Sequence, residues 1–448
     1  MTRETLTEKA PSGLAHETIA RSTTAVGSVA VVGLWYVGLP LAILAGERGF
    51  WVRGFDVDTR KIESLRARRA PFLSKEETAQ FKKSRMHIGD NDALLVDADI
   101  YLICVPTPVN ENHEPDLGPL IEASKRIGPY VRKGALVIIE STVDPGACER
   151  VALPIIERDS GLTAEKDFLF AHCPERINPG DSVWDVRTIP RVVGGSGEKS
   201  LNAAVAFYQS ILDGPIKPMG SIREAEAVKM VENAFRDVNI AFVNELAMSF
   251  AKGGLDIVNV IEGASTKPFA FMPHFPGCGV GGHCIPVDPY YLIRYGHENG
   301  FEHRFLAMAR EINNGMPHYT VDLLEQELEE RGAELNGATV ALLGLAYKRD
   351  VPDLRESPAL TIRSALEMRG AIIRTFDPFV PGESTHTSLE SVFDGADAAI
   401  IATDHSLFRT LAPEQFQRYG ISVVIDGRNC LDKLAFAESP VTYRGIGH

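Results

Sequence analysis

The segment 276–289, which reads PGCGVGGHCIPVDP, contains the residue types needed for chemistry at a sulfur atom. The glycines before Cys284 have no side chains, so the backbone and a ligand can come close to the thiol. Asp288 follows four residues later and could act as a general base. A cysteine taken alone is more often a small buried hydrophobic residue. The segment therefore predicts a nucleophile only if other parts of the chain supply partners.

A lysine and an asparagine four residues apart are candidate partners. Lys229 and Asn233 lie in the stretch 222–252, which keeps apolar residues at helical spacing and contains no glycine or proline. Gly253 and Gly254 end this stretch, so we predict a single long helix. Residues at i and i+4 share a helix face, and an ammonium beside an amide can stabilise a developing oxyanion. Taken alone, an exposed polar face explains the pair better.

A glycine-rich turn near the N-terminus has the layout of a dinucleotide-binding site. The segment 33–38, GLWYVG, follows a strand pattern and opens a helical one, and Asp56 ends the next strand pattern. The helix N-terminus then faces a pyrophosphate, and the acid accepts hydrogen bonds from the adenosine ribose, which favours NAD over NADP. Trp35 replaces the glycine that lets the backbone approach the pyrophosphate. Trp35→Gly therefore tightens NAD binding if the indole crowds the cofactor; otherwise the loop has adapted around it.

A second α/β pattern begins at 338–347 and lacks a glycine triplet, so we expect it to bind something other than a second NAD. Ser357 as N-cap and Pro358 as first helical residue mark the start of its helix. Lys348 and Arg428 each follow a predicted strand, where open parallel sheets bind ligands, and cations there suit a pyrophosphate. Taken singly, each is more often a solvated surface charge.

These patterns predict an α/β protein with two Rossmann-like doubly wound domains, joined by a long central helix and a helical middle domain. The stretch 265–291 is rich in proline and glycine, and so long an irregular segment usually has a function. We expect a flexible N-terminal extension at 1–27, an NAD-binding domain at 28–215, a helical middle with the cysteine loop at 216–332, and a nucleotide-binding domain at 333–448.

Composition narrows the class of protein. The 448 residues carry 46 Lys and Arg against 60 Asp and Glu, and the net charge of -14 disfavours nucleic acid or an anionic membrane as partner. No apolar run reaches the length of about 18 residues that a membrane span needs. The six cysteines are scattered without a CxxC pair, so we expect no disulfide framework and no metal site. These features favour a cytoplasmic protein.

Several motifs, taken in order, resemble those of the UDP-glucose/GDP-mannose dehydrogenase family, whose members are nucleotide-sugar 6-dehydrogenases with two Rossmann-like domains joined by a long helix. The resemblance covers about residues 28–440. It rests on GLWYVGLPLA, CVPTP (104–108), ESTVDPG (140–146), CPERINPGD (173–181), EAVKMVENAFRDVNIAFVNE (226–245), PGCGVGGHCIPVDPYYL (276–292), GLAYKRDVPDLRESPAL (344–360) and DGRN (426–429). The GGHCIPVDPYYL form is similar to the branch that acts on UDP-N-acetylhexosamines.

The resemblance implies a role for each matching residue. Catalytic roles fall on Cys284 as nucleophile, Lys229 and Asn233 as the pair that orients an oxyanion and water, Thr142 and Glu175 as residues that order water and sugar, and Asp288 as base. The implied contacts to NAD come from Gly33, Tyr36, Val37, Gly38, Asp56, Thr107 and Arg355, and those to the UDP-sugar from Lys348, Arg428, Gly281, Gly282 and His283. The chain departs from the family at Trp35, and at Cys278 and Cys173, which we expect to border the sugar.

The implied reaction is a four-electron oxidation of the C6 hydroxyl of a UDP-hexose through a thiohemiacetal and a thioester on Cys284. We expect UDP-N-acetylglucosamine or UDP-N-acetylmannosamine as substrate, and a homodimer or higher homo-oligomer formed through the central helix. Burial should raise the pKa of Cys284, and Lys229 or a helix terminus should lower it again.

Three alternatives stay open. The substrate could be UDP-glucose or TDP-glucose, with the glucuronate as product. Trp35 motivates a second alternative, a non-catalytic protein that binds NAD or a nucleotide sugar. The third is a two-electron dehydrogenase of the 6-phosphogluconate type, which shares the fold and the Lys-Asn pair, needs no cysteine and would be indifferent to thiol alkylation.

Overall fold

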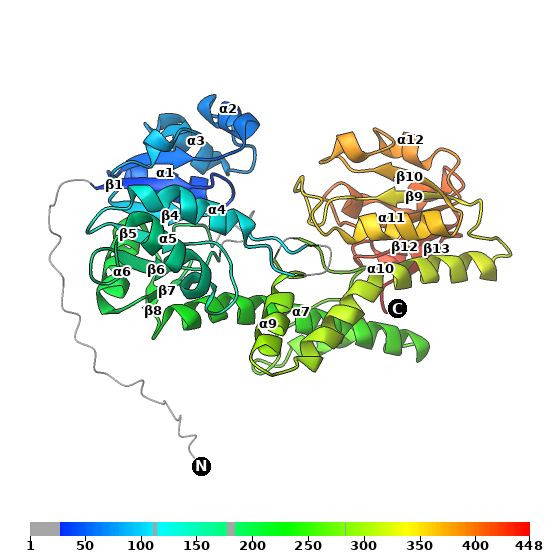
Figure 1. Cartoon of the computed structure of the whole chain (residues 1–448). Coiled ribbons are helices and arrows are strands. Elements are labelled where there is room, and N and C mark those ends of the chain that lie inside the picture. The colour runs from blue at the N-terminus through cyan, green and yellow to red at the C-terminus, as the bar shows by residue number, and fades with distance from the viewer. Residues whose placement is uncertain (1–26, 111–113, 177–183, 283) are drawn as a thin grey trace, which may run out of the picture.

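The computed structural model describes residues 27–110, 114–176, 184–282 and 284–448, and nearly all of the expected N-terminal extension lies outside them. Two lobes, each built on a β-sheet, stand side by side over a layer of long helices (Figure 1). The first sheet has eight strands in the order β3-β2-β1-β4-β5-β6-β7-β8, and the second has five in the order β10-β9-β11-β12-β13. The predicted α/β class with two sheets and a helical middle is therefore confirmed.

The first lobe is doubly wound around its sheet. Its strands are β1 (Ser28–Val32), β2 (Trp51–Phe55), β3 (His87–Gly89), β4 (Ile100–Ile103), β5 (Leu136–Ile139), β6 (Leu169–His172), β7 (Arg191–Gly195) and β8 (Ile216–Pro218). Its helices are α1 (Gly38–Glu47), α2 (Thr59–Arg66), α3 (Lys75–Lys83), α4 (Gly118–Ile127), α5 (Leu153–Ser160) and α6 (Glu198–Ile211). In β1, Val29 and Val31 pack into one core and Ala30 and Val32 into the other, as expected for a strand covered on both faces.

One pair of strands in this sheet departs from the parallel arrangement. β7 runs antiparallel to β6, with Ala171 opposite Gly195, while the other pairs of the sheet are parallel. The apolar pattern of the sequence indicates a buried strand but not its direction, so this reversal was not predicted.

The second lobe is wound in the same way around a parallel sheet. Its strands are β9 (Thr339–Leu343), β10 (Ile372–Phe376), β11 (Ala398–Ile401), β12 (Val423–Asp426) and β13 (Thr442–Gly445). Its helices are α11 (Pro358–Met368), α12 (Leu389–Phe393), α13 (Pro413–Gln417) and α14 (Lys433–Ala437). The hydroxyl of Ser357 accepts a hydrogen bond from the amide of Ala359, so the predicted N-cap of α11 is confirmed.

The two sheets begin with the same turn. After β1, the amide of Gly33 donates to the carbonyl of Phe55 over 2.9 Å; after β9, the amide of Gly344 donates to the carbonyl of Phe376 over 3.0 Å. Each turn therefore joins the first strand of its sheet to the end of the neighbouring strand.

In both turns, an aspartate side chain accepts a hydrogen bond from the amide of the residue after the glycine. The two aspartates differ in how accessible their carboxylates are to a ligand. Leu34 donates to Asp56 over 2.8 Å, and Leu345 donates to Asp377 over 2.7 Å. Asp377 is fully buried, and His405 Nε2 lies 3.0 Å from the carboxylate oxygen that accepts from Leu345. The second domain therefore keeps the turn but covers the acid that would hold a ribose.

The helical middle lies under both lobes (Figure 1) and contains α7 (Ile222–Lys252), α8 (Ile257–Ser265), α9 (Asp288–Glu298) and α10 (Arg304–Glu330). The bounds of α7 confirm the single long helix predicted over 222–252. The hydroxyl of Ser221 accepts from the amide of Glu224 and begins the helix, and Gly253 ends it. The chain between α8 and α9 has no helix or strand in its described residues.

A buried polar network joins α7 to α10 and to the cysteine loop. Arg310 donates to Asp237 over 2.6 Å, and the side-chain amide of Asn313 donates to the same carboxylate over 2.8 Å. Asn244 donates to Asn313 over 2.9 Å and accepts from the amide of Gly277 over 3.0 Å. The network therefore holds the start of the cysteine loop against the long helix.

Asp237→Ala is expected to lower the free energy of unfolding by about 3 kcal/mol, because it leaves the buried charge of Arg310 without its partner. The matched control is Glu298→Ala, which removes the acid of an exposed pair with Arg294. That change should cost less than about 1 kcal/mol. Thermal unfolding of the two variants by scanning calorimetry compares them, and equal losses would contradict the importance of the network.

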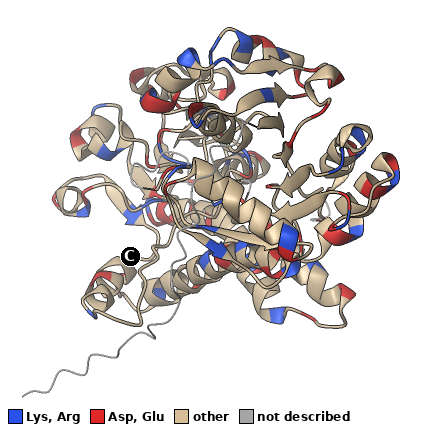
Figure 2. Ribbon diagram, turned by 90° about the vertical axis from the view of Figure 1, so that its left-hand side faces the viewer, with Lys and Arg blue, Asp and Glu red and all other residues tan. Residues whose placement is uncertain are grey.

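Lys and Arg lie interspersed with Asp and Glu on the helices and loops seen in Figure 2, so the net charge of -14 is distributed among many elements. Among the described residues, no helix combines the length and apolar character that crossing a bilayer requires.

Candidate active site

Gly33 and Gly38 are required by the turn itself. Gly33 has a φ of +92°, and a Cβ on it would lie 2.6 Å from the carbonyl oxygen of Cys104. A Cβ on Gly38 would lie 1.9 Å from the carbonyl oxygen of Gly33. The turn therefore closes tightly onto the carboxyl ends of β1 and β4, and the N-terminus of α1 begins directly beside it.

A cavity of about 580 Å³ opens over this turn, and its lining includes Gly33, Leu34, Trp35 and Asp56. The carboxylate of Asp56 is nearly buried and accepts from the amide of Leu34 over 2.8 Å and from Lys61 over 2.9 Å. A tight turn, a helix N-terminus and an oriented carboxylate are the parts that fit the adenosine diphosphate half of NAD. The predicted cofactor residues Gly33 and Asp56 thus meet in one place.

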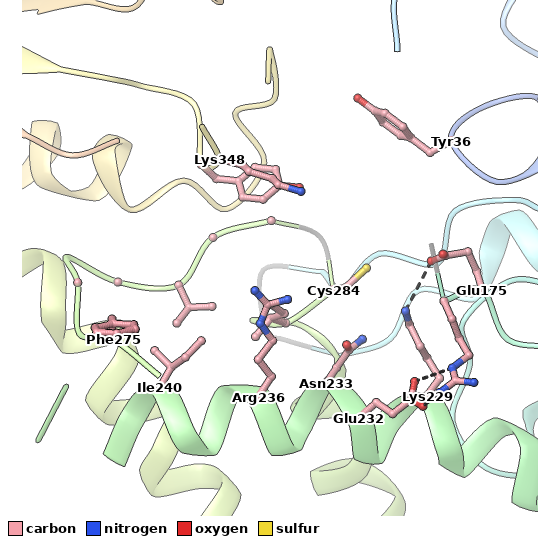
Figure 3. Close-up of a pocket in the computed structure, with 18 of the residues that line it drawn as sticks. Tyr36, Glu175, Lys229, Glu232, Asn233, Arg236, Ile240, Phe275, Cys284 and Lys348 are labelled. Carbon is pink, nitrogen blue, oxygen red and sulfur yellow. Dashed lines mark hydrogen bonds and ion pairs between the residues drawn. The ribbon is translucent and has the colours of Figure 1, made fainter. Parts of the chain in front are cut away.

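A second cavity of about 530 Å³ lies above α7, between the two lobes (Figure 3). Its lining includes Tyr36 and Val37 from the first lobe, Glu175, Lys229, Asn233, Gly281, Gly282 and Cys284 from the middle of the site, and Lys348 and Arg428 from the second lobe. Predicted catalytic, cofactor and substrate residues from separate parts of the chain are therefore represented in its lining, although some of the predicted residues lie outside it. His283 lies outside the described residues.

Lys229 carries a stable positive charge at the floor of this cavity. Its ammonium lies 3.6 Å from the carboxylate of Glu175 (Figure 3). Burial by itself would lower the pKa of Lys229, but the surrounding acidic groups, led by Glu175, hold it above its ordinary value. A buried cation beside a reactive sulfur can stabilise negative charge that develops on a substrate oxygen.

Asp288 is the first residue of α9 and is positioned by α7. The side-chain amide of Asn233 donates to its carboxylate over 2.5 Å. Burial raises the pKa of Asp288 to about 7, although Lys229 and the hydrogen bond from Asn233 favour the charged form. Asp288 is therefore poised to gain or lose a proton near neutral pH. Asp288 is not among the residues that line the cavity, whereas its hydrogen-bond partner Asn233 is.

Burial favours the thiol form of Cys284. The backbone carbonyl of Cys284 accepts a hydrogen bond from the amide of Asp288 over 2.8 Å, which places Cys284 at the N-terminal end of α9. Burial, followed by the nearby charge of Asp288, raises the pKa of Cys284 well above its ordinary value, and Lys229 offsets only part of this. Lys229 lowers the pKa as expected, but desolvation outweighs its effect.

Thr107 and Thr142 are joined to each other beside the cavity. The hydroxyl of Thr107 donates to the carbonyl of Thr142, and the hydroxyl of Tyr291 donates to the carbonyl of Thr107 over 2.7 Å. Tyr291 belongs to α9, so the loops that follow β4 and β5 are fixed to the helix that begins at Asp288. Neither threonine is among the residues that line the two cavities.

Arg355 connects the two lobes at the cofactor turn. Its guanidinium carbon lies 5.8 Å from the ring centroid of Tyr36, a cation–π distance. Its carbonyl accepts from the amide of Gly282 over 3.0 Å. Arg428, on the same lobe, donates through Nε to the carbonyl of Ala402 over 2.9 Å. Arg428 is thus held in place in the lining of the cavity, and Arg355 lies outside that lining.

The two cysteines expected to border the sugar are buried beneath the surface of the cavity. Cys278 is fully buried; its amide donates to the carbonyl of Gly427 and its sulfur to that of Ala402. Cys173 is also fully buried, with its sulfur 3.8 Å from a guanidinium nitrogen of Arg191. Neither lines the cavity. Cys278 fastens the cysteine loop to the second lobe, and Cys173 packs against Arg191. That either cysteine borders the sugar stays a prediction.

Several lining residues were missed by the reading of the sequence. Arg236 and Ile240 extend the face of α7 that carries Lys229 and Asn233 (Figure 3). Their spacing along the helix was a usable signal. Tyr347 also lines the cavity, and a Cβ on Gly281 would lie 2.6 Å from its Cβ, which explains the glycine there.

Comparisons with known proteins match this arrangement. Three domain models of the UDP-glucose/GDP-mannose dehydrogenase family match in order: the NAD binding domain at 27–212, the central domain at 223–315 and the UDP binding domain at 341–433. UDP-N-acetyl-D-mannosamine dehydrogenase of Pyrococcus horikoshii is 38% identical over 94% of this chain and 99% of its own length. UDP-N-acetyl-D-glucosamine 6-dehydrogenase of Pseudomonas aeruginosa is 38% identical over 90% of this chain and 97% of its own length.

A solved structure agrees with the sequence comparisons. The UDP-D-ManNAc dehydrogenase of Pyrococcus horikoshii superposes with a TM-score of 0.88 at 37% identity, covering 94% of this chain and 99% of that one. The likeness extends over both lobes and the helical middle. The chain therefore belongs to the UDP-glucose/GDP-mannose dehydrogenase family and is an NAD-dependent nucleotide-sugar dehydrogenase.

Proposed function

We propose that the chain oxidises the C6 hydroxyl of a UDP-N-acetylhexosamine to the carboxylate, using two molecules of NAD and a covalent intermediate on Cys284. The observation that carries this proposal is the cavity in which Cys284, Lys229 and Asn233 face cations of the second lobe. Relatives named as UDP-N-acetylmannosamine and UDP-N-acetylglucosamine dehydrogenases at 38% identity support the choice of sugar.

The cofactor and the nucleotide sugar occupy different lobes in this proposal. Gly33, Gly38 and Asp56 would hold the adenosine diphosphate half of NAD, and Thr107 and Arg355 would contact the remainder. NAD, when bound, supplies the acceptor for hydride from C6. Lys348 and Arg428 would bind the diphosphate of the substrate, because they bring positive charge to the opposite side of the cavity.

Cys284 keeps the half-oxidised sugar on the protein. After the first oxidation, its sulfur forms a bond to C6 of the aldehyde, and the thiol proton ends on the former carbonyl oxygen. Loss of a second hydride and of that proton leaves a thioester. Because burial raises the pKa of the free thiol, the thiol proton would leave as the bond to carbon forms. Lys229 and Asn233 would stabilise the developing oxyanion.

Hydrolysis completes the reaction. Asp288, whose pKa is about 7, would take a proton from the attacking water, and Thr142 and Glu175 would order that water and the sugar. The carbon–sulfur bond then breaks and the thiol is regenerated. In total, one alcohol, two NAD and one water give one carboxylate, two NADH and three protons.

An assay with several nucleotide sugars tests the proposal. UDP-N-acetylglucosamine, UDP-N-acetylmannosamine, UDP-glucose and TDP-glucose are each supplied with excess NAD, and NADH is counted per sugar consumed. The expected result is a ratio of two with an N-acetylated sugar. A pocket that hydrogen-bonds the acetamido group should favour it over glucose in kcat/KM by a large factor. Release of free aldehyde with one NADH per sugar consumed would contradict the covalent route. A preference for UDP-glucose or TDP-glucose would contradict the proposed N-acetylated substrate.

We also propose a homodimer formed through α7. Val231, Phe235 and Phe242 lie on one face of this helix, and each is at least half exposed in the single chain. An exposed apolar stripe of this kind is typical of a protein–protein contact. Light scattering should therefore give a mass near twice the 48.9 kDa of one chain.

Phe242→Asp is expected to shift this dimer toward the monomer, because it places a charge within the apolar stripe. Met368→Asp is the control, since Met368 is an exposed apolar residue on the second lobe. A monomeric mass for the unchanged protein, or equal behaviour of the two variants, would rule out this interface.

A cytoplasmic location is part of the same proposal. All six cysteines, including the two that are only partly buried, are described as thiols and not as disulfides. A reducing compartment keeps such thiols available.

A further inference from the structure

Of the three positions of the cofactor turn that usually carry glycine, the one occupied by Trp35 is the one where the fold itself does not demand it. Its neighbours Gly33 and Gly38 would clash with the backbone if they carried a Cβ. Trp35, in contrast, is not among the residues with a positive φ. A glycine there would therefore serve only the approach of a ligand, and the indole is tolerated by the turn without backbone strain.

The indole is held to one side by two neighbours. Its ring centroid lies 4.4 Å from that of Phe72, in a tilted contact, and the ammonium of Lys61 lies 5.3 Å from the indole centroid. Lys61 is in turn paired with Asp56 over 2.9 Å. These contacts orient the ring against the segment between α2 and α3.

The orientation leaves the indole at the wall of the cofactor cavity. Trp35, Asp56 and Lys61 line the same 580 Å³ space, and Trp35 remains 39% exposed. An aromatic face that stays partly exposed beside a cavity gains contact area when a ligand covers it. The cation over the ring adds positive charge at the same wall, where a pyrophosphate or a ribose would lie.

We infer that Trp35 is an NAD-binding residue of this chain, whose indole, braced by Phe72 and Lys61, forms part of the wall that contacts the adenosine diphosphate half of the cofactor. The inference concerns the first lobe and the cofactor, so it does not depend on the identity of the sugar. It reverses the expectation that the indole crowds the pyrophosphate. Loss of the ring should weaken binding.

Binding measurements without sugar test this inference. Calorimetric titration of Trp35→Gly with NAD and with ADP-ribose should show about tenfold weaker binding of both, the size expected for one lost aromatic contact. Trp35→Phe keeps a ring against Phe72 and should fall between this variant and the unchanged protein. Phe72→Ala removes the brace and should weaken binding in the same direction. Tighter or unchanged binding by Trp35→Gly would overturn the inference.

Quenching of tryptophan emission by NADH distinguishes direct contact between Trp35 and the cofactor from a general loosening of the turn. NADH bound beside Trp35 should quench its emission by energy transfer. Trp51→Phe is the matched control, because Trp51 is exposed and begins β2, at the end of the strand opposite to Asp56. The control should keep most of the quenching, and Trp35→Phe should lose most of it. Equal quenching in the two variants would place the indole away from the cofactor.

Discussion

Cys284→Ala is expected to lower the rate of carboxylate formation by at least about 10⁴-fold, the scale on which loss of a covalent nucleophile acts. The alanine has no atom that can hold the aldehyde for a second oxidation. NADH produced per sugar should then fall from two toward one or zero, while binding of NAD stays unchanged because Cys284 lies outside the cofactor cavity.

Two comparisons make the experiment specific. Cys430→Ala is the matched control, since Cys430 is also a partly buried cysteine but is not among the residues that line the cavity. It should keep activity within a few-fold. In addition, mass spectrometry of the unchanged protein, quenched with acid during turnover, should detect a sugar attached through Cys284. Full carboxylate production by Cys284→Ala would refute the covalent route.

The rate of turnover should rise with pH and level off above an apparent pKa near 7. Asp288 accepts a proton from water only as the carboxylate, and burial raises its pKa to about 7, so the active fraction grows as pH increases through this value. Asp288→Asn should reduce kcat by about 10³-fold and remove this dependence, because the amide cannot accept the proton. Measurement of kcat with saturating substrates between pH 5.5 and about 8.5 shows both effects.

A second buried carboxylate provides the control for this pH profile. Glu226 also has a pKa of about 7, raised by burial, and its side chain accepts from the amides of Gly146 and Cys148. It fastens the loop after β5 to α7 and does not line the cavity. Glu226→Gln should therefore retain the rise in kcat near pH 7. If the rise disappears in Glu226→Gln and persists in Asp288→Asn, the assignment of the base is wrong.

Some elements follow from local sequence alone. The bounds of α7 could be predicted because its 31 residues contain no glycine or proline and are followed by Gly253 and Gly254. Ser357 and Pro358 marked the start of α11 for the same local reason. The reversed direction of β7 could not be predicted, since a short buried strand has the same apolar pattern in either direction.

For the site, the sequence predicted which residues come together but not all of their positions or their pKa values. Residues within recognisable motifs were found, and the structure brings Cys284, Lys229 and Asn233 into one cavity. The position of Cys278 was not predictable, because its side chain is fixed by contacts with the distant Ala402 and Gly427. The raised pKa of Cys284 depends on the balance between burial and several charges, which no spacing of residues reveals.

The burial of Asp377 in the second lobe bears on how many NAD molecules can bind at one time. Asp377 is enclosed with His405, whereas Asp56 lines the cofactor cavity, so we propose a single NAD site, in the first lobe. If the proposed reaction takes two hydrides at this one site, NADH must leave and a second NAD must enter while the sugar is half oxidised. With NAD bound to the first lobe and the nucleotide sugar to the second, the proposed bond to Cys284 would keep the sugar on the protein during this exchange.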